Sequence, residues 1–115
     1  MATFTEARHT GEHMISEAPG TLSRDEVTIA SGAGVLPVGQ VLGKITVSGK
    51  YAAYNNANTD GTEVAAGILY AAADATSADM PAIAHVRNCE VAEIHLTGID
   101  ANGIADLAAH DVLVR

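Results

Sequence analysis

Apolar and polar residues alternate along much of the chain, which is the pattern of half-buried β-strands. The segment from 25 to 30 is the clearest example, because its β-branched residues stand at alternate positions. The run from 63 to 73 is instead almost continuously apolar, and its β-branched residues and the central Gly67 favour a buried strand over a helix. The strands expected from these patterns cover residues 25–30, 41–47, 50–54, 63–73, 82–87, 90–96 and 112–115.

Turn-forming residues separate these segments. Ser48-Gly49 lies between two expected strands and predicts a hairpin. The sequence NNANTDG at 55–61 predicts a surface loop, because Asn, Asp and Gly tolerate left-handed backbone. We expect residues 35–40 to form a loop because a central strand would not accept Pro37. Residues 74–80 are expected to form a polar loop.

One segment near the C-terminus has helical spacing. Asp100 or Asn102 is a suitable N-cap for a helix that follows it. Ile104, Leu107 and Ala108 then fall on one face, which we expect to be buried. A chain of many short strands with one short helix predicts a β-rich α+β fold.

The first 23 residues differ from the remainder of the chain. They are rich in Thr, Glu, His, Gly and Ser, and their sparse apolar residues follow no sustained period. Such a segment buries too little apolar surface on its own to offset the entropy lost when it becomes ordered. We therefore expect two parts, an extended arm over residues 1–23 and a β-rich domain over residues 24–115.

Composition and charge exclude several classes of protein. The chain has 115 residues, which suits one domain, and its formal net charge of −8 disfavours both nucleic acids and anionic membranes as partners. A single cysteine rules out an internal disulfide. The N-terminal residues lack the basic and apolar stretches of a signal peptide, and no run is long enough to span a membrane, so we expect synthesis in a cytosol-like compartment.

The sequence HTGEH at 9–13 matches a pattern of metal ligands used by one class of zinc peptidases. That chemistry needs His9 and His13 on one helical face, with Glu12 as the base. Thr10 and Gly11 are poor helix formers, however, and the flanking residues offer no apolar helical face. We therefore favour an exposed polar arm here over a metal-dependent hydrolase, and expect neither a metal nor a cofactor.

Cys89 is the other residue that could carry chemistry. A nucleophilic thiol needs a low pKa and an adjacent imidazole, and His85 and His95 are the nearest histidines along the chain. A structural role for this cysteine is the commoner case. We expect no catalytic residue, and therefore a binding or structural protein and not an enzyme.

Several stretches of the chain, taken in order and with their spacing, resemble the head decoration proteins of lambda-like tailed bacteriophages. They begin with TEARHTGEHMIS and continue to LAAHDVLVR at the end of the chain. The stretches that carry the resemblance are residues 5–20, 22–29, 34, 39–46, 60–70, 73–76 and 107–115. Pro37-Val38 departs from the family pattern, and the region from 79 to 98 matches least.

The resemblance implies a compact β-clip-type domain that assembles as a homotrimer on the phage major capsid protein. It further implies a location on the outer surface of the virion capsid, at three-fold and quasi-three-fold sites of the expanded shell, which the protein would stabilise against internal DNA pressure. The N-terminal arm would bind the capsid by adding an extended segment to the coat protein's sheet. The residues we expect in this arm are Thr3, Phe4, Thr5, His9, Met14, Ile15 and Pro19. A generic β-rich adaptor domain remains the alternative.

Overall fold

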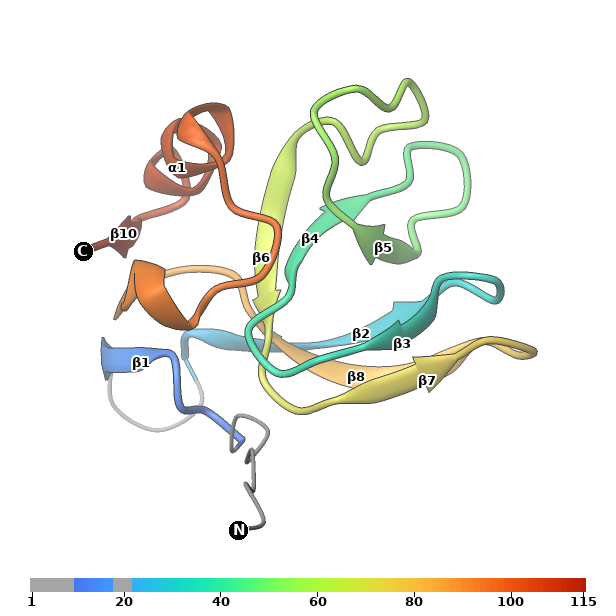
Figure 1. The fold of residues 1–115 in the computed structure, drawn as a ribbon, viewed down its shortest axis with the longest axis horizontal. Coiled ribbons are helices and arrows are strands. Elements are labelled where there is room, and N and C mark those ends of the chain that lie inside the picture. Colours follow the sequence, from blue (N-terminus) through green and yellow to red (C-terminus); the bar gives the residue numbers. More distant parts are fainter. Residues whose placement is uncertain (1–9, 18–21) are drawn as a thin grey trace, which may run out of the picture.

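The computed structural model describes residues 10–17 and 22–115 of the chain. Short strands dominate these residues (Figure 1). The elements in chain order are β1 (Met14–Glu17), β2 (Arg24–Ile29), β3 (Gly34–Leu36), β4 (Val41–Lys44), β5 (Tyr51–Ala53), β6 (Ala65–Leu69), β7 (Ala73–Ala75), β8 (Met80–His85), β9 (Cys89–Val91), the 3₁₀ helix η1 (Glu93–His95), α1 (Ala101–Ala108) and β10 (Val112–Val114).

A closed barrel forms the centre of the fold, with its strands in the order β2-β5-β4-β6-β8. Neighbouring barrel strands are antiparallel, except that β2 and β5 meet in parallel at Ile29 and Tyr51. The hairpin expected around Ser48-Gly49 is confirmed, because β4 and β5 are antiparallel neighbours. The buried strand expected within 63–73 is also confirmed as β6, which lies between β4 and β8.

The barrel interior holds one of two hydrophobic clusters. Its members come from strands on all sides of the barrel and from the β3-β7 pair, and small aliphatic side chains predominate. The buried residues of this inner cluster are Val27, Ile29, Leu36, Leu42, Leu69, Ala75 and Ala84. None of residues 10–17 belongs to this inner cluster.

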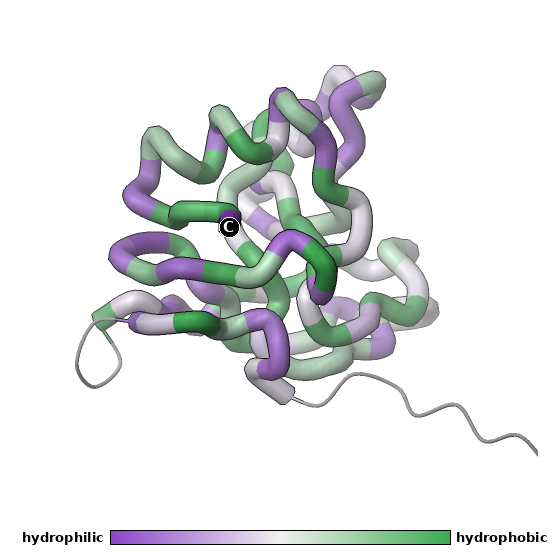
Figure 2. Tube along the Cα trace, turned by 60° about the vertical axis from the view of Figure 1, so that its left-hand side comes forward, coloured by the Kyte–Doolittle hydropathy of each residue, from purple (hydrophilic) through white to green (hydrophobic). Residues whose placement is uncertain are grey.

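A second layer covers one side of the barrel. The sheet β1-β9-β10 and the helix α1 lie beside β6 in Figure 1. Figure 2 looks at this side, where β10, β9 and β1 lie one below another and each carries apolar residues. The buried residues between this layer and the barrel are Val41, Tyr54, Ala65, Ile68, Cys89, Val91, Leu96, Leu107 and Val112.

The single α-helix among the described residues begins where the capping signal placed it. Asp100 is the N-cap, and its side chain accepts a hydrogen bond from the Gly103 N–H at 2.7 Å. The same carboxylate accepts one from the hydroxyl of Tyr54 at 2.8 Å. Of the expected apolar face, Leu107 is fully buried, Ile104 is half-buried and Ala108 is exposed.

Three of the expected boundaries are wrong. The polar loop expected over 74–80 is shorter, because residues 74 and 75 belong to strand β7 and residue 80 begins β8. Residues 34–36 form strand β3, not a loop, because they pair with β7 ahead of Pro37. The strand expected over 90–96 ends at Val91, and the next turn is the 3₁₀ helix η1. Alternation misled the prediction there, since Ile94 is 80% exposed and does not point into the core.

The predicted class is confirmed: the domain is a strand-rich α+β fold with one short helix near the C-terminus. None of the helices in residues 10–17 and 22–115 is long and apolar enough to cross a membrane.

Candidate functional site

The structure describes two of the seven residues expected in the capsid-binding arm. Met14 and Ile15 form the start of β1 and are therefore extended. Met14 packs against the second cluster, whereas Ile15 is 53% exposed on the other face of the strand. The remaining residues, Thr3, Phe4, Thr5, His9 and Pro19, lie outside the described part of the chain.

Residues 10–17, which we call the N-terminal strap, lie against the domain through main-chain contacts. Strand β1 pairs antiparallel with β9, with Met14 opposite Val91 and Glu17 opposite Cys89. Beyond the strand, the Ala92 N–H donates to the carbonyl oxygen of His13 at 2.7 Å, and the Gly11 N–H donates to that of Tyr70 at 3.0 Å. The structure therefore places this part of the expected arm on the domain.

Gly11 allows this close approach because it has no side chain. Its φ is +71°, in the left-handed region that favours glycine. A Cβ at this position would lie 3.0 Å from the ring of Tyr70. The strap is therefore fitted closely to the barrel at its first turn.

His13 is fully buried, so the expectation that it belongs to an exposed polar arm is wrong. Its Nε2 lies 3.1 Å from Nδ1 of His85, which is also fully buried. The two rings meet edge to face, with their centroids 5.2 Å apart. The contact pairs one nitrogen of His13, which lowers the cost of burying this imidazole, while its Nδ1 is buried without a hydrogen-bond partner among the described residues.

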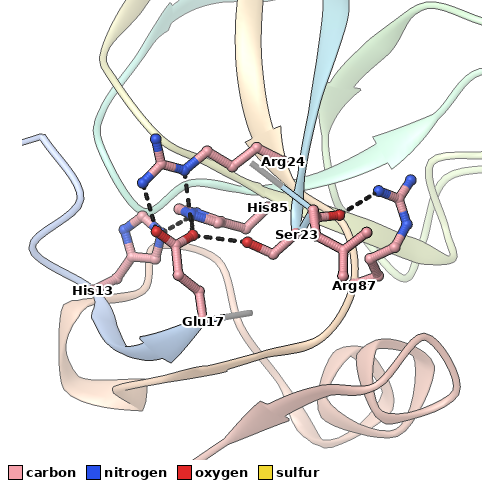
Figure 3. Close-up of polar contacts among 7 residues, drawn as sticks. His13, Glu17, Ser23, Arg24, His85 and Arg87 are labelled. Carbon is pink, nitrogen blue, oxygen red and sulfur yellow. Dashed lines mark hydrogen bonds and ion pairs between the residues drawn. The ribbon is translucent and has the colours of Figure 1, made fainter. Parts of the chain in front are cut away.

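Glu17, at the end of β1, joins this pair to the barrel (Figure 3). Its Oε2 lies 2.9 Å from His85 Nε2 and accepts from the Ser23 hydroxyl at 2.7 Å. Arg24 donates from Nη2 to Oε1 at 2.6 Å and from Nε to Oε2 at 3.2 Å, which is a bidentate ion pair. We call His13, Glu17, Ser23, Arg24 and His85 the anchoring cluster.

The charge states of the anchoring cluster follow from its contacts. The Arg24 guanidinium, with smaller contributions from Ser23 and His85, lowers the pKa of Glu17 to about 2. Burial, with smaller contributions from the neighbouring His85 and His95, lowers the pKa of His13 to about 4 against the opposing effect of Glu17. Burial also lowers the pKa of His85, and it outweighs the opposing effect of Glu17. At neutral pH the cluster thus combines an ionised Glu17–Arg24 pair with two neutral imidazoles.

The side chains of HTGEH are not arranged as metal ligands where they are described. His13 points to His85, while Oε2 of Glu12 lies 3.9 Å from Nδ1 of His95. Residues 10–17 and 22–115 contain no group of three His, Cys, Asp or Glu residues placed to hold a metal ion. His9 lies outside the described residues.

Cys89 is a buried free thiol in β9. Burial, with a smaller contribution from Glu17, raises its pKa to about 11. A nucleophilic cysteine needs a lowered pKa, so this environment opposes catalysis and agrees with the structural role.

The face of the β1-β9-β10 sheet that points away from the barrel is partly apolar. Ile15 and Leu113 are exposed on it, at 53% and 41%. Between them, Glu90 accepts a hydrogen bond from Nε of Arg115 at 2.9 Å. Among the described residues β1 is an edge strand of this sheet, so its outer main-chain groups border the apolar face.

Sequence reasoning did not find the anchoring cluster. His13 and His85 are 72 residues apart, and no spacing rule connects them. The residues around His13 carried no signal for its burial, because its apolar neighbour Met14 would point to the opposite face of an extended chain.

Comparison with known protein families gives a match over nearly the whole chain. The family described as bacteriophage lambda head decoration protein D matches residues 3–112. A comparison with curated individual proteins finds no match. The match extends from the residues before the strap to the last strand, and the chain therefore belongs to the bacteriophage lambda head decoration protein D family.

Proposed function

We propose that this protein binds as a homotrimer to three-fold and quasi-three-fold sites on the outside of the expanded capsid and stabilises the shell against the pressure of packaged DNA. The observation that carries the proposal is the family match over residues 3–112, which makes the chain a structural, capsid-decorating protein of the phage head. The phage major capsid protein is the partner we propose. The acidic net charge of −8 is compatible with a solvent-facing position and with a partner that offers positive charge.

We assign capsid binding to residues of the arm over 1–23, which lie before, in and directly after the N-terminal strap. β1 is an edge strand, and an extended segment that enters the coat protein's sheet would gain main-chain hydrogen bonds without a strict sequence requirement. The assigned residues divide by burial: Ile15 is exposed and available to a partner, while Met14 packs against the protein's own core. Thr3, Phe4, Thr5, His9 and Pro19 keep their proposed place in this contact.

A trimer would compensate for a weak individual contact. Each residue that becomes ordered on binding costs about 1–2 kcal/mol before its contacts repay it. Three arms on one particle make the second and third attachments intramolecular, which raises avidity by about 10²–10⁴. Binding restricted to the expanded lattice then stabilises that lattice by mass action, so no catalysis is required.

The test uses the purified protein with expanded empty capsids and with unexpanded procapsids of its phage. Light scattering gives the mass of the free protein, and co-sedimentation gives binding. We expect a trimer that sediments with expanded capsids and not with procapsids. A protein that binds neither particle would refute the decoration role and favour the adaptor alternative.

Deletion of residues 2–9 tests the part of the arm that precedes the strap, because it leaves the strap and the anchoring cluster intact. We expect this variant to keep the thermal stability of the full chain and to lose capsid binding. A variant of full length, in which residues 2–9 are replaced by Gly and Ser, controls for chain length. Capsid binding equal to that of the full chain in either variant would contradict the assignment to these residues.

A further inference from the structure

The N-terminal strap is held to the barrel by a buried pair of imidazoles. His13 comes from the strap and His85 from the end of barrel strand β8, and both are fully buried. Glu17 of the strap contacts the other nitrogen of His85 through Oε2, and Ser23 and Arg24, at the start of barrel strand β2, also donate hydrogen bonds to the Glu17 carboxylate (Figure 3). The strap and the barrel thus meet at titratable groups.

The hydrogen atoms of this chain of contacts can be assigned from the charge of Glu17. Glu17 is an ionised acceptor, so Nε2 of His85 must carry the proton and donate it to Oε2. Nδ1 of His85 is then unprotonated and accepts from Nε2–H of His13 at 3.1 Å. Nδ1 of His13 therefore carries a lone pair, and it is buried without a hydrogen-bond partner among the described residues.

A further proton has no good place in this arrangement. On His13 it would create a buried N–H at Nδ1 with nothing to accept its hydrogen bond. On Nδ1 of His85 it would meet the N–H of His13, and the His13 tautomer would have to reverse, which again leaves a buried donor at Nδ1 of His13. Added protonation is therefore accommodated only when the pair separates and its nitrogens reach water.

The charged groups around the His13–His85 pair do not offset the cost of an added proton. Glu17 on the strap is the carboxylate in contact with it, and Arg24 of β2 already neutralises that carboxylate. The Arg24 guanidinium also lies 4.4 Å from the centre of the Tyr70 ring, which packs edge to face against His85. His95 of η1, which faces Glu12, is the remaining titratable neighbour that acts on His13.

We propose that the His13–His85 pair is an acid-sensitive latch, which holds the N-terminal strap on the barrel while both rings are neutral and releases residues 10–17 when they take up protons. The barrel is expected to stay folded on release. Its inner cluster contains no strap residue, and Met14 is the strap's one partly buried contribution to the second cluster. The inference concerns the isolated protein and does not depend on its proposed trimer or capsid contacts.

The direction of the pH dependence follows from proton linkage. Both histidines have a lower pKa in the docked state than when free, so docking is fully stabilised above pH 6.5 and is lost as the pH falls toward about 4. For His13 alone, the difference between 6.5 and about 4 corresponds to docking that is weaker by about 300-fold once the pH is well below 4, and by about 80-fold at pH 4.5. Protonation of Glu17 also weakens docking, at lower pH, because the pKa of Glu17 is about 2 in the docked state and 4.5 ordinarily.

Nitrogen-15 NMR of the full chain between pH 7.5 and 4.5 tests the latch without any substitution. We expect the imidazole shifts of His13 and His85 at pH 7.5 to report neutral rings protonated at Nε2. As the pH falls, the amide signals of residues 12–17 should move to the positions of an unstructured peptide, while those of β4, β6 and β8 stay in place. Strap signals that remain unchanged at pH 4.5, or barrel signals lost in the same transition, would each overturn the proposal.

Substitutions then separate the latch from a general effect of acid. The double variant His13→Phe, His85→Phe keeps two packed rings and the Glu17–Arg24 pair but cannot take up protons. We expect its strap to stay docked at pH 4.5. His110→Gln is the matched control, because His110 is an exposed histidine in the turn after α1, and it should release its strap as the unmodified chain does. Release of the strap at the same pH in the double variant would refute the latch. If that variant fails to fold, the imidazole titration of the unmodified chain tests whether release of the strap follows protonation of the two rings.

Discussion

Leu107 is the side chain that connects α1 to the barrel, and its replacement by alanine should cost a large part of the stability of the domain. It is fully buried in the cluster between α1 and β6. The change removes three carbon groups, worth about 2.4 kcal/mol at about 0.8 kcal/mol each. A cavity in a rigid site adds to this, so we expect Leu107→Ala to lower the free energy of unfolding by about 3–5 kcal/mol.

Leu113 provides the matched control, because it is the same residue type in the neighbouring strand β10. It is 41% exposed, so only part of the free energy of burying three carbon groups is lost, and the space left by the side chain is filled by water. Leu113→Ala should therefore cost no more than about 1.4 kcal/mol. Leu107→Met, which nearly conserves volume, should cost less than about 1.5 kcal/mol.

Urea unfolding followed by circular dichroism measures all three variants. The midpoints should move in the order Leu107→Ala, then the two milder variants, with unchanged slopes that indicate the same unfolding reaction. A loss below about 1 kcal/mol for Leu107→Ala, or one equal to that of Leu113→Ala, would refute the conclusion that α1 is held by a buried leucine.

Two further predictions concern single positions. Gly39 and Gly34 both have a positive φ, but a Cβ at Gly39 would overlap a carbonyl oxygen of η1, whereas a Cβ at Gly34 meets nothing within 4 Å. Gly34→Ala should cost about 1–2 kcal/mol and Gly39→Ala at least about 2 kcal/mol more, and equal losses in urea unfolding would contradict the close contact. Cys89 should react with a thiol reagent only after unfolding, because it is buried and its pKa is raised to about 11; rapid labelling of the native protein at pH 8 would show that this thiol is accessible.

Local signals predicted the elements that depend on neighbours in sequence. The β4-β5 hairpin follows from its glycine turn, and α1 follows from Asp100 and the spacing of Leu107. The partner of β3 could not be predicted, because β7 lies far along the chain and its pairing leaves no local trace. The 3₁₀ helix η1 could not be predicted either, because residues distant in sequence hold its main chain. The Glu93 N–H, for example, donates to the carbonyl oxygen of Arg115.

The family and the candidate site differ in how far the sequence determined them. The resemblance to head decoration proteins rested on stretches spread over the chain, and the family match over residues 3–112 confirms it. The anchoring cluster, in contrast, depends on two histidines that only the folded chain brings to within 3.1 Å of each other. A polar residue in a polar segment looks exposed in sequence, and only its partner explains why His13 is buried.

The anchoring cluster also bears on the energetics of the proposed capsid contact. Composition changes near residue 23, but packing against the domain already includes residues 10–17. Strap residues that are ordered before binding add no ordering cost at the capsid, whereas each residue ordered there costs about 1–2 kcal/mol. A docked strap therefore favours tight attachment by a short arm, while a released strap would extend the reach of the arm and weaken its binding. The His13–His85 latch and the capsid-binding arm are thus energetically coupled in our proposals, because the latch determines how many residues of the arm are free of the domain.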